Sequence, residues 1–80
     1  MQFPTEINAD IIKRLRRVEG QVRGLQRLVE EESECKEIVT QLAAVKGALD
    51  RVGFKLMAAA MSDSEGADPE ELERLFLKLG

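Results

Sequence analysis

The sequence predicts an all-α fold of three helices, two long and one short, on three observations. Apolar residues recur every three or four positions through two long stretches, residues 11–29 and 38–56. A shorter apolar stretch follows Asp-Pro-Glu-Glu at residues 68–71, a typical helix start. No segment shows the strict apolar–polar alternation of a half-buried strand. We therefore expect residues 1–80 to form a single helical domain.

The first helix is expected over about residues 9–31, after an arm of residues 1–9. Pro4 is expected to prevent an earlier start, and Asn8 to cap the first turn. The apolar stripe of this helix consists of Ile11, Leu15, Val18, Val22, Leu25 and Val29. Gly20 and Gly24 each cost about 1 kcal/mol relative to alanine inside a helix. A close contact with another helix, or with a ligand backbone, would explain them.

The second helix is expected over about residues 34–61 with Ser33 as its N-cap, and the third over about 69–79. Asp68 is the expected N-cap of the third helix, with Pro69 at its first position. The stripe of the second helix is Ile38, Leu42, Val45, Leu49, Val52 and Leu56, and that of the third is Leu72, Leu75, Phe76 and Leu79. Both patterns have helical spacing.

Short length and sparse aromatic content predict that the chain associates with other copies. A chain of 80 residues buries only about 60% of its unfolded surface. It has no Trp or Tyr, and its one Cys cannot form a disulfide within the chain. Long amphipathic helices cannot cover each other in a monomer, so we expect two antiparallel helical hairpins to pair as a four-helix bundle. The third helix would add a further contact between copies.

Charge is segregated along the chain. The net charge is −3, yet residues 13–27 are rich in arginine, while residues 30–37 and 63–73 are acidic. An arginine-rich helix face on an acidic protein predicts a surface for a polyanion, with nucleic acid the first candidate. The alternative is a solvated helix face. The sequence has no His and no phosphate-binding glycine-rich loop, so we predict that the protein is not an enzyme.

The single cysteine fits a reducing cytoplasm, and no apolar run approaches the ~20 residues of a membrane span. The N-terminal residues lack the pattern of a secretory signal. We therefore expect a soluble, cytoplasmic protein with no membrane partner.

Two runs, RLRRVEGQVRGLQRLVEEESEC (Arg14–Cys35) and IVTQLAAVKGALDRVG (Ile38–Gly53), closely resemble the copper-sensitive operon repressor (CsoR/RcnR-like) family. The resemblance covers about residues 10–64. It implies an all-α homotetramer, a dimer of dimers, that binds operator DNA through flat basic faces. It also implies that an inducer bound near the second helix releases the DNA. The resemblance thus implies a DNA-binding transcriptional repressor whose partners are operator DNA and copies of itself.

In that family, a basic residue early in the first helix and another midway along the second are important for operator binding. Arg14 and Arg51 match these positions, and both lie off the apolar stripes. Phosphate contacts from them would make the affinity strongly salt-dependent. Further candidates for DNA contact are Lys13, Arg16, Arg17, Arg23, Lys46 and Lys55. The alternative for each is a surface ion pair, for example with Glu19 or Asp50.

The expected sensing site departs from the family pattern. Copper-sensing members use a Cys at the start of the second helix, then a His and a Cys near its end, with the two cysteines from different subunits. Cys35 matches the first ligand, but Ala60 and Ser64 occupy the other two positions. Alanine has no donor atom, and a serine hydroxyl is a poor ligand for Cu(I). We therefore expect no cofactor other than a metal ion held at Cys35 in a non-standard site.

Three interpretations of Cys35 stay open. It is a lone thiol that senses an electrophile or oxidant, although the second Cys of persulfide sensors and the N-terminal proline of formaldehyde sensors are both missing. Alternatively, Met57 and Met61 complete a soft metal site with Cys35 of a second chain. The competing interpretation of both methionines is that they fill the core. In the third interpretation, the repressor has lost its inducer or responds to another signal.

The leading prediction is a repressor whose inducer acts near Cys35. The alternative is a helical scaffold that does not bind DNA and forms hetero-oligomers with a ligand-complete paralogue.

Overall fold

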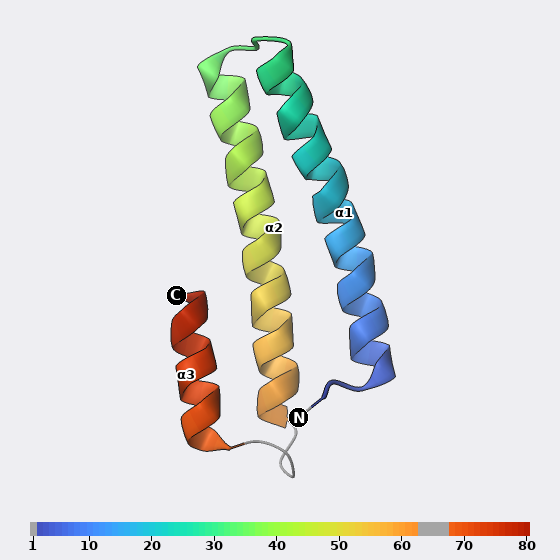
Figure 1. The fold of residues 1–80 in the computed structure, drawn as a ribbon, viewed down its shortest axis with the longest axis vertical. Helices are drawn as coiled ribbons and strands as arrows, with labels where there is room; N and C mark the ends of the chain where they lie inside the picture. Colours follow the sequence, from blue (N-terminus) through green and yellow to red (C-terminus); the bar gives the residue numbers. More distant parts are fainter. Residues whose placement is uncertain (1, 63–67) are drawn as a thin grey trace.

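A computed structural model shows three helices, α1 (Thr5–Glu30), α2 (Cys35–Ser62) and α3 (Pro69–Leu79). The structure describes residues 2–62 and 68–80, and these contain no strand, so the prediction of an all-α fold with three helices is confirmed. Figure 1 shows α1 and α2 as a long antiparallel hairpin, with α3 beside the C-terminal half of α2. Within the described ranges, α3 packs against α2 and not against α1.

The first helix begins earlier than the sequence suggested. It starts at Thr5, with Pro4 in the N-cap position at φ −57°, so the expected arm of residues 1–9 is largely helical. Proline is tolerated there because its fixed φ suits the entry to a helix and the missing N–H has no helical partner. Its carbonyl oxygen accepts from the N–H of Asn8 at 3.0 Å. Asn8 therefore lies inside the first turn and does not cap it.

A tight turn joins α1 to α2. The N–H of Glu32 donates to the carbonyl of Val29 at 3.1 Å, and that of Ser33 to the carbonyl of Leu28 at 3.0 Å. These two bonds define a Schellman motif, with Glu32 in the left-handed region at φ 55°. Ser33 thus closes the turn after α1, and the expectation that it is the N-cap of α2 is wrong. The carbonyl of Glu34 accepts the first bonds of α2 instead.

Only alternate members of the two long apolar stripes are buried in the hairpin. The buried apolar residues are Ile11 and Val18 from α1 and Val45, Val52, Met57 and Ala60 from α2. Three further stripe members are partly buried, namely Leu25, Ile38 and Leu56. The others are substantially exposed, namely Leu15, Val22, Val29, Leu42 and Leu49. We call the line of contact between the buried stripe residues of α1 and α2 (Ile11, Val18, Val45 and Val52) the seam. By helical spacing, the exposed stripe residues of both helices lie on the same side of this seam. The hairpin therefore carries one apolar face that the described residues leave open.

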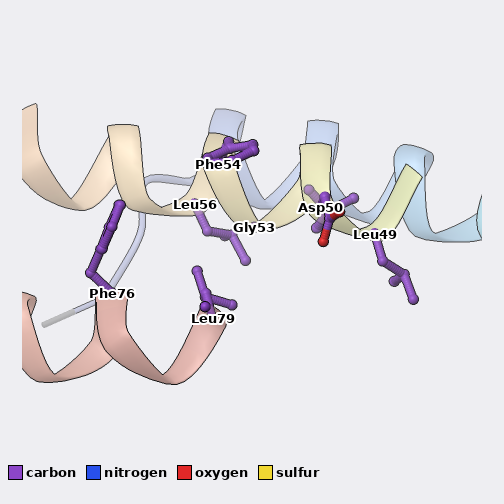
Figure 2. A pocket seen from close by; sticks show the side chains of 9 residues that line it. Leu49, Asp50, Gly53, Phe54, Leu56, Phe76 and Leu79 are labelled. Carbon is purple, nitrogen blue, oxygen red and sulfur yellow. The ribbon is translucent and has the colours of Figure 1, made fainter. Parts of the chain in front are cut away.

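The short third helix starts as expected. Asp68 accepts from the N–H of Glu70 at 3.1 Å, and Pro69 is the first helical residue. Its C-terminal end closes over Gly53, where an added Cβ would lie 3.4 Å from a methyl group of Leu79. Figure 2 shows Phe76 and Leu79 of α3 facing α2. The missing side chain at Gly53 therefore lets α3 approach α2 closely.

Candidate nucleic-acid interface and sensing cysteine

Asp10 joins cations from both long helices. One of its oxygens, Oδ2, accepts a hydrogen bond from Nε of Arg14 at 3.1 Å and lies 3.5 Å from Nζ of Lys55. The hydrogen bond from Arg14, with the positive charges of Arg14 and Lys55, lowers the pKa of Asp10, although desolvation opposes the shift. The carboxylate is therefore ionised at neutral pH and holds the two cations near one point.

The register of the hairpin brings Arg51 to the same level. Asp10 of α1 contacts Lys55 of α2. Fourteen residues further along α1, Gly24 lies against Gln41, which is fourteen residues before Lys55 on α2. The two helices keep one antiparallel register between these points, so Arg14 is level with Arg51 along the hairpin. Arg51 also lies one turn before Lys55 on α2 and is exposed.

The cations gather on the face opposite the apolar one. A helix turns by about 100° per residue, so the direction of each side chain follows from its distance in sequence from Ile11 or Val45. By this measure, Arg14, Arg51 and Lys55 lie on the other side of the seam from the exposed stripe residues. Arg17 lies one turn beyond Arg14 on this side, and Lys13 lies at its edge. We call the surface made by Lys13, Arg14, Arg17, Arg51 and Lys55 the cationic face.

The structure does not bring the other three candidates to the cationic face. Arg23 lies nine residues beyond Arg14, and Lys46 nine residues before Lys55, about two and a half turns in each case. Both therefore point from the opposite side of their helices, as does Arg16. Arg23 instead lies 3.9 Å from Glu19, in the surface ion pair considered from the sequence.

Sequence reasoning missed the bridging position of Asp10. Its spacing of four from Arg14 was a usable signal for that ion pair. Nothing local in the sequence indicates Lys55, because this contact depends on the register of two helices.

Cys35 is the first residue of α2, and its thiol is exposed. Ala60, at the family position of the second ligand, is buried near the other end of α2 and has no donor atom. Twenty-five helical residues separate the two positions by about 38 Å. One chain therefore cannot bring them together, and only a second chain could complete a site at Cys35.

The residues present do not fit the metal site that the family resemblance implies. The described residues hold no group of three His, Cys, Asp or Glu side chains that could bind a metal ion. Ser64, at the third family position, lies outside the described residues. Met57 is buried and Met61 is exposed, and both border an apolar cavity of about 370 Å³ that α3 partly closes. The burial of Met57 is that of a core residue.

A larger apolar groove, of about 550 Å³, runs between α2 and α3 (Figure 2). Asp50 is the only charged side chain among its lining residues, which are Leu49, Asp50, Val52, Gly53, Phe54, Leu56, Phe76, Leu79 and Gly80.

Comparison with known proteins shows the family to which the chain belongs. A family model described as metal-sensitive transcriptional repressor matches residues 7–76, and the chain belongs to this family. The copper-sensing transcriptional repressor RicR of Mycobacterium tuberculosis is 45% identical over 58 residues, which are 72% of this chain and 60% of that protein. The copper-sensing transcriptional repressor CsoR of Bacillus subtilis is 45% identical over 47 residues, 59% of this chain and 46% of that protein. No solved structure matches.

The match confirms the family resemblance seen in the sequence. The family consists of transcriptional repressors, which are not enzymes. The chain spans about half to 60% of the length of these two relatives. None of the helices in the described ranges has the length and apolar character needed to cross a membrane.

Proposed function

We propose that this protein is a DNA-binding transcriptional repressor that acts in the cytoplasm and contacts operator DNA through its cationic face. The observation that carries the proposal is the convergence of Arg14 and Lys55, from two helices, on Asp10 at the level of Arg51. Three cations, Arg14, Arg51 and Lys55, gather at this level of the hairpin, on a chain whose net charge is −3. A local positive surface on an acidic protein attracts phosphates in one orientation only.

The open apolar face supports a dimer of hairpins. Leu42 and Leu49 of α2 are 51% and 46% exposed, and Leu15 of α1 is 39% exposed. Apolar side chains in such a row are normally covered in a folded assembly. Pairing of two hairpins through this face makes a four-helix bundle with both cationic faces outward. We propose that two such dimers form a homotetramer, with the exposed apolar residues of α3 in the second contact.

The individual cations are proposed to contribute unequally. Arg14 and Arg51 make the main phosphate contacts, with Lys55, Lys13 and Arg17 beside them. Arg16, Arg23 and Lys46 lie around the apolar side of the hairpin and contribute less. Each phosphate contact releases counterions, so affinity falls steeply as salt rises.

Inducer action is proposed to begin near Cys35. The support is the exposed thiol at the start of α2, the one cysteine of the chain. Since Ala60 offers no ligand, we propose that Cu(I) or Ni(II) is not held in the three-ligand manner of the family. A Cu(I) titration against a strong chelator, with Cys35→Ala as control, tests this point. Stoichiometric binding by the wild-type protein that the chelator cannot compete away would contradict it.

The test of the proposed function is a binding titration with the DNA upstream of the protein's own gene. Salt-sensitive retardation of that fragment, but not of a scrambled fragment of equal length, is the expected result. An absence of any shift at micromolar protein would instead favour the non-binding scaffold. A mixing experiment with a ligand-complete paralogue would then test hetero-oligomer formation.

A further inference from the structure

We propose that Asp10 is a positioning residue for DNA recognition, which holds Arg14 and Lys55 together as a preformed clamp for the DNA backbone. The inference rests on the proposed function of the cationic face and adds an acidic residue to it. Asp10 forms the ion pair that links α1 to α2 in the described ranges, and its Oδ2 atom contacts both cations.

The geometry leaves the clamp able to bind phosphate. Arg14 donates to Asp10 through Nε, so this hydrogen bond does not use its two terminal amino groups. Those groups carry four of the five N–H donors of a guanidinium. Lys55 has three donors, and its contact with Asp10 is long, at 3.5 Å. Both side chains can therefore keep Asp10 and still donate to a phosphate oxygen.

Burial and a hydrogen bond both restrict the side chain of Arg14. It is 35% exposed, whereas that of Arg23, paired with Glu19 on the same helix, is 74% exposed. Long basic side chains lose rotamer freedom when they bind DNA. A side chain that is ordered in the free protein loses less, so Asp10 is expected to favour binding despite its negative charge.

An effect of charge alone would make DNA binding tighter, not weaker, when Asp10 is removed. If Asp10 acted only as a negative charge beside the phosphates, its removal would tighten binding. Glu19 provides the matched control, because it also lies four residues before an arginine on α1, and its ion pair is with that arginine, Arg23, on the same helix. The variants Asp10→Ala and Glu19→Ala change the net charge equally.

The experiment is a fluorescence anisotropy titration of the full-length oligomer with the upstream DNA fragment over a salt series. Asp10→Ala is expected to weaken binding by up to about fivefold, the upper end of the range that corresponds to one exposed ion pair. Glu19→Ala is expected to bind at least as tightly as the wild-type protein. The magnitude of the salt slope should fall by about one for Asp10→Ala if one phosphate contact is lost. Asp10→Ala binding as tightly as Glu19→Ala would overturn the inference.

Two further measurements separate positioning from folding. In a Lys55→Ala background, Asp10→Ala should weaken binding less than it does in the wild-type protein, because part of the clamp is already missing. Asp10→Asn keeps a hydrogen-bond acceptor and should recover part of the affinity lost in Asp10→Ala. If Asp10→Ala fails to assemble, the DNA affinities of Asp10→Asn and Glu19→Gln are compared instead. Equal affinities of these two variants would overturn the inference.

The result is distinguishable from a failure of the proposed function. If the wild-type protein binds and Arg14→Ala does not, while Asp10→Ala binds normally, only the positioning role fails. If the wild-type protein does not bind the fragment, the cationic face itself is refuted, and the positioning role with it.

Discussion

Gln41 of α2 donates a hydrogen bond from Nε2 to the main-chain carbonyl oxygen of Gln21 on α1, across 3.1 Å. The amide fits because Gly24 has no side chain, and a Cβ there would lie 3.4 Å from the same nitrogen. A carbonyl oxygen has two lone pairs, so it can accept this bond together with its helical one. The contact lies in the half of the hairpin nearer the turn and has the same register that places Asp10 beside Lys55.

Gln41→Ala should therefore loosen the hairpin. We expect the free energy of unfolding to fall by about 0.5–1.5 kcal/mol, the net value of one hydrogen bond. Urea denaturation at fixed protein concentration measures this loss. Thr40→Ala is the control, because the Thr40 hydroxyl bonds only to the carbonyl of Lys36 on its own helix. An equal loss in both variants would show that the cross-helix bond does not stabilise the hairpin.

Glu32→Gly should stabilise the turn between α1 and α2. Glu32 has φ 55°, a conformation that costs a residue with a Cβ about 1–2 kcal/mol and costs glycine little. We expect a gain of about 0.5–1 kcal/mol in the free energy of unfolding, after the greater freedom of glycine in the unfolded chain is counted. Glu31→Gly, at φ −82°, should give no gain. A Glu32→Gly protein no more stable than Glu31→Gly would contradict this account of the turn.

Leu42→Asp should dissociate the assembly. Leu42 is 51% exposed on the open apolar face, and each symmetric pair of hairpins would lose two leucine contacts, worth about 1 kcal/mol each because each side chain is already half buried. Sedimentation velocity should then show a smaller species at concentrations where the wild-type protein is assembled. Ala43→Asp adds the same charge at an exposed neighbour that points away from α1 and should leave the assembly intact. Unchanged sedimentation of Leu42→Asp would refute the dimer face.

The ion pairs of Asp10 should make stability depend on pH. The pKa of Asp10 is lowered below its ordinary value of 3.8, chiefly by the hydrogen bond from Arg14. A lowered pKa in the folded state means that the ionised carboxylate stabilises the fold above the ordinary value, and that this contribution is lost as pH falls through the lowered pKa. The stability advantage of the wild-type protein over Asp10→Asn should thus be full at pH 7 and shrink in acid. An advantage that does not change with pH would contradict this origin.

Residues at the ends of helices predicted the helix boundaries well where the boundary depends on a single turn of the chain. Asp68 and Pro69 marked the start of α3, because a cap and a fixed φ operate within one turn. Pro4 misled because the same fixed φ that breaks a helix interior is accepted at its N-cap. Ser33 misled because a capping hydroxyl cannot be told in sequence from the residue that closes a Schellman motif.

The candidate site was predictable only in part. Arg14 and Arg51 were nominated from the sequence, and the hairpin places them at one level. Lys46 and Lys55 looked equivalent in sequence, but half a turn separates the faces from which they point. The bridge from Asp10 to Lys55 needed the register of the hairpin, which Gly24 and Gln41 set through contacts between distant parts of the chain.

The most direct measurement is the affinity of Arg51→Ala for the upstream DNA fragment, compared with Lys46→Ala at the same salt concentration. Both variants remove one positive charge from α2, but only Arg51 lies on the cationic face. We predict that Arg51→Ala abolishes specific retardation up to micromolar protein, with unchanged sedimentation, and that Lys46→Ala binds nearly as the wild-type protein does. Wild-type affinity in Arg51→Ala, or an equal loss in Lys46→Ala, would contradict the assignment of the cationic face.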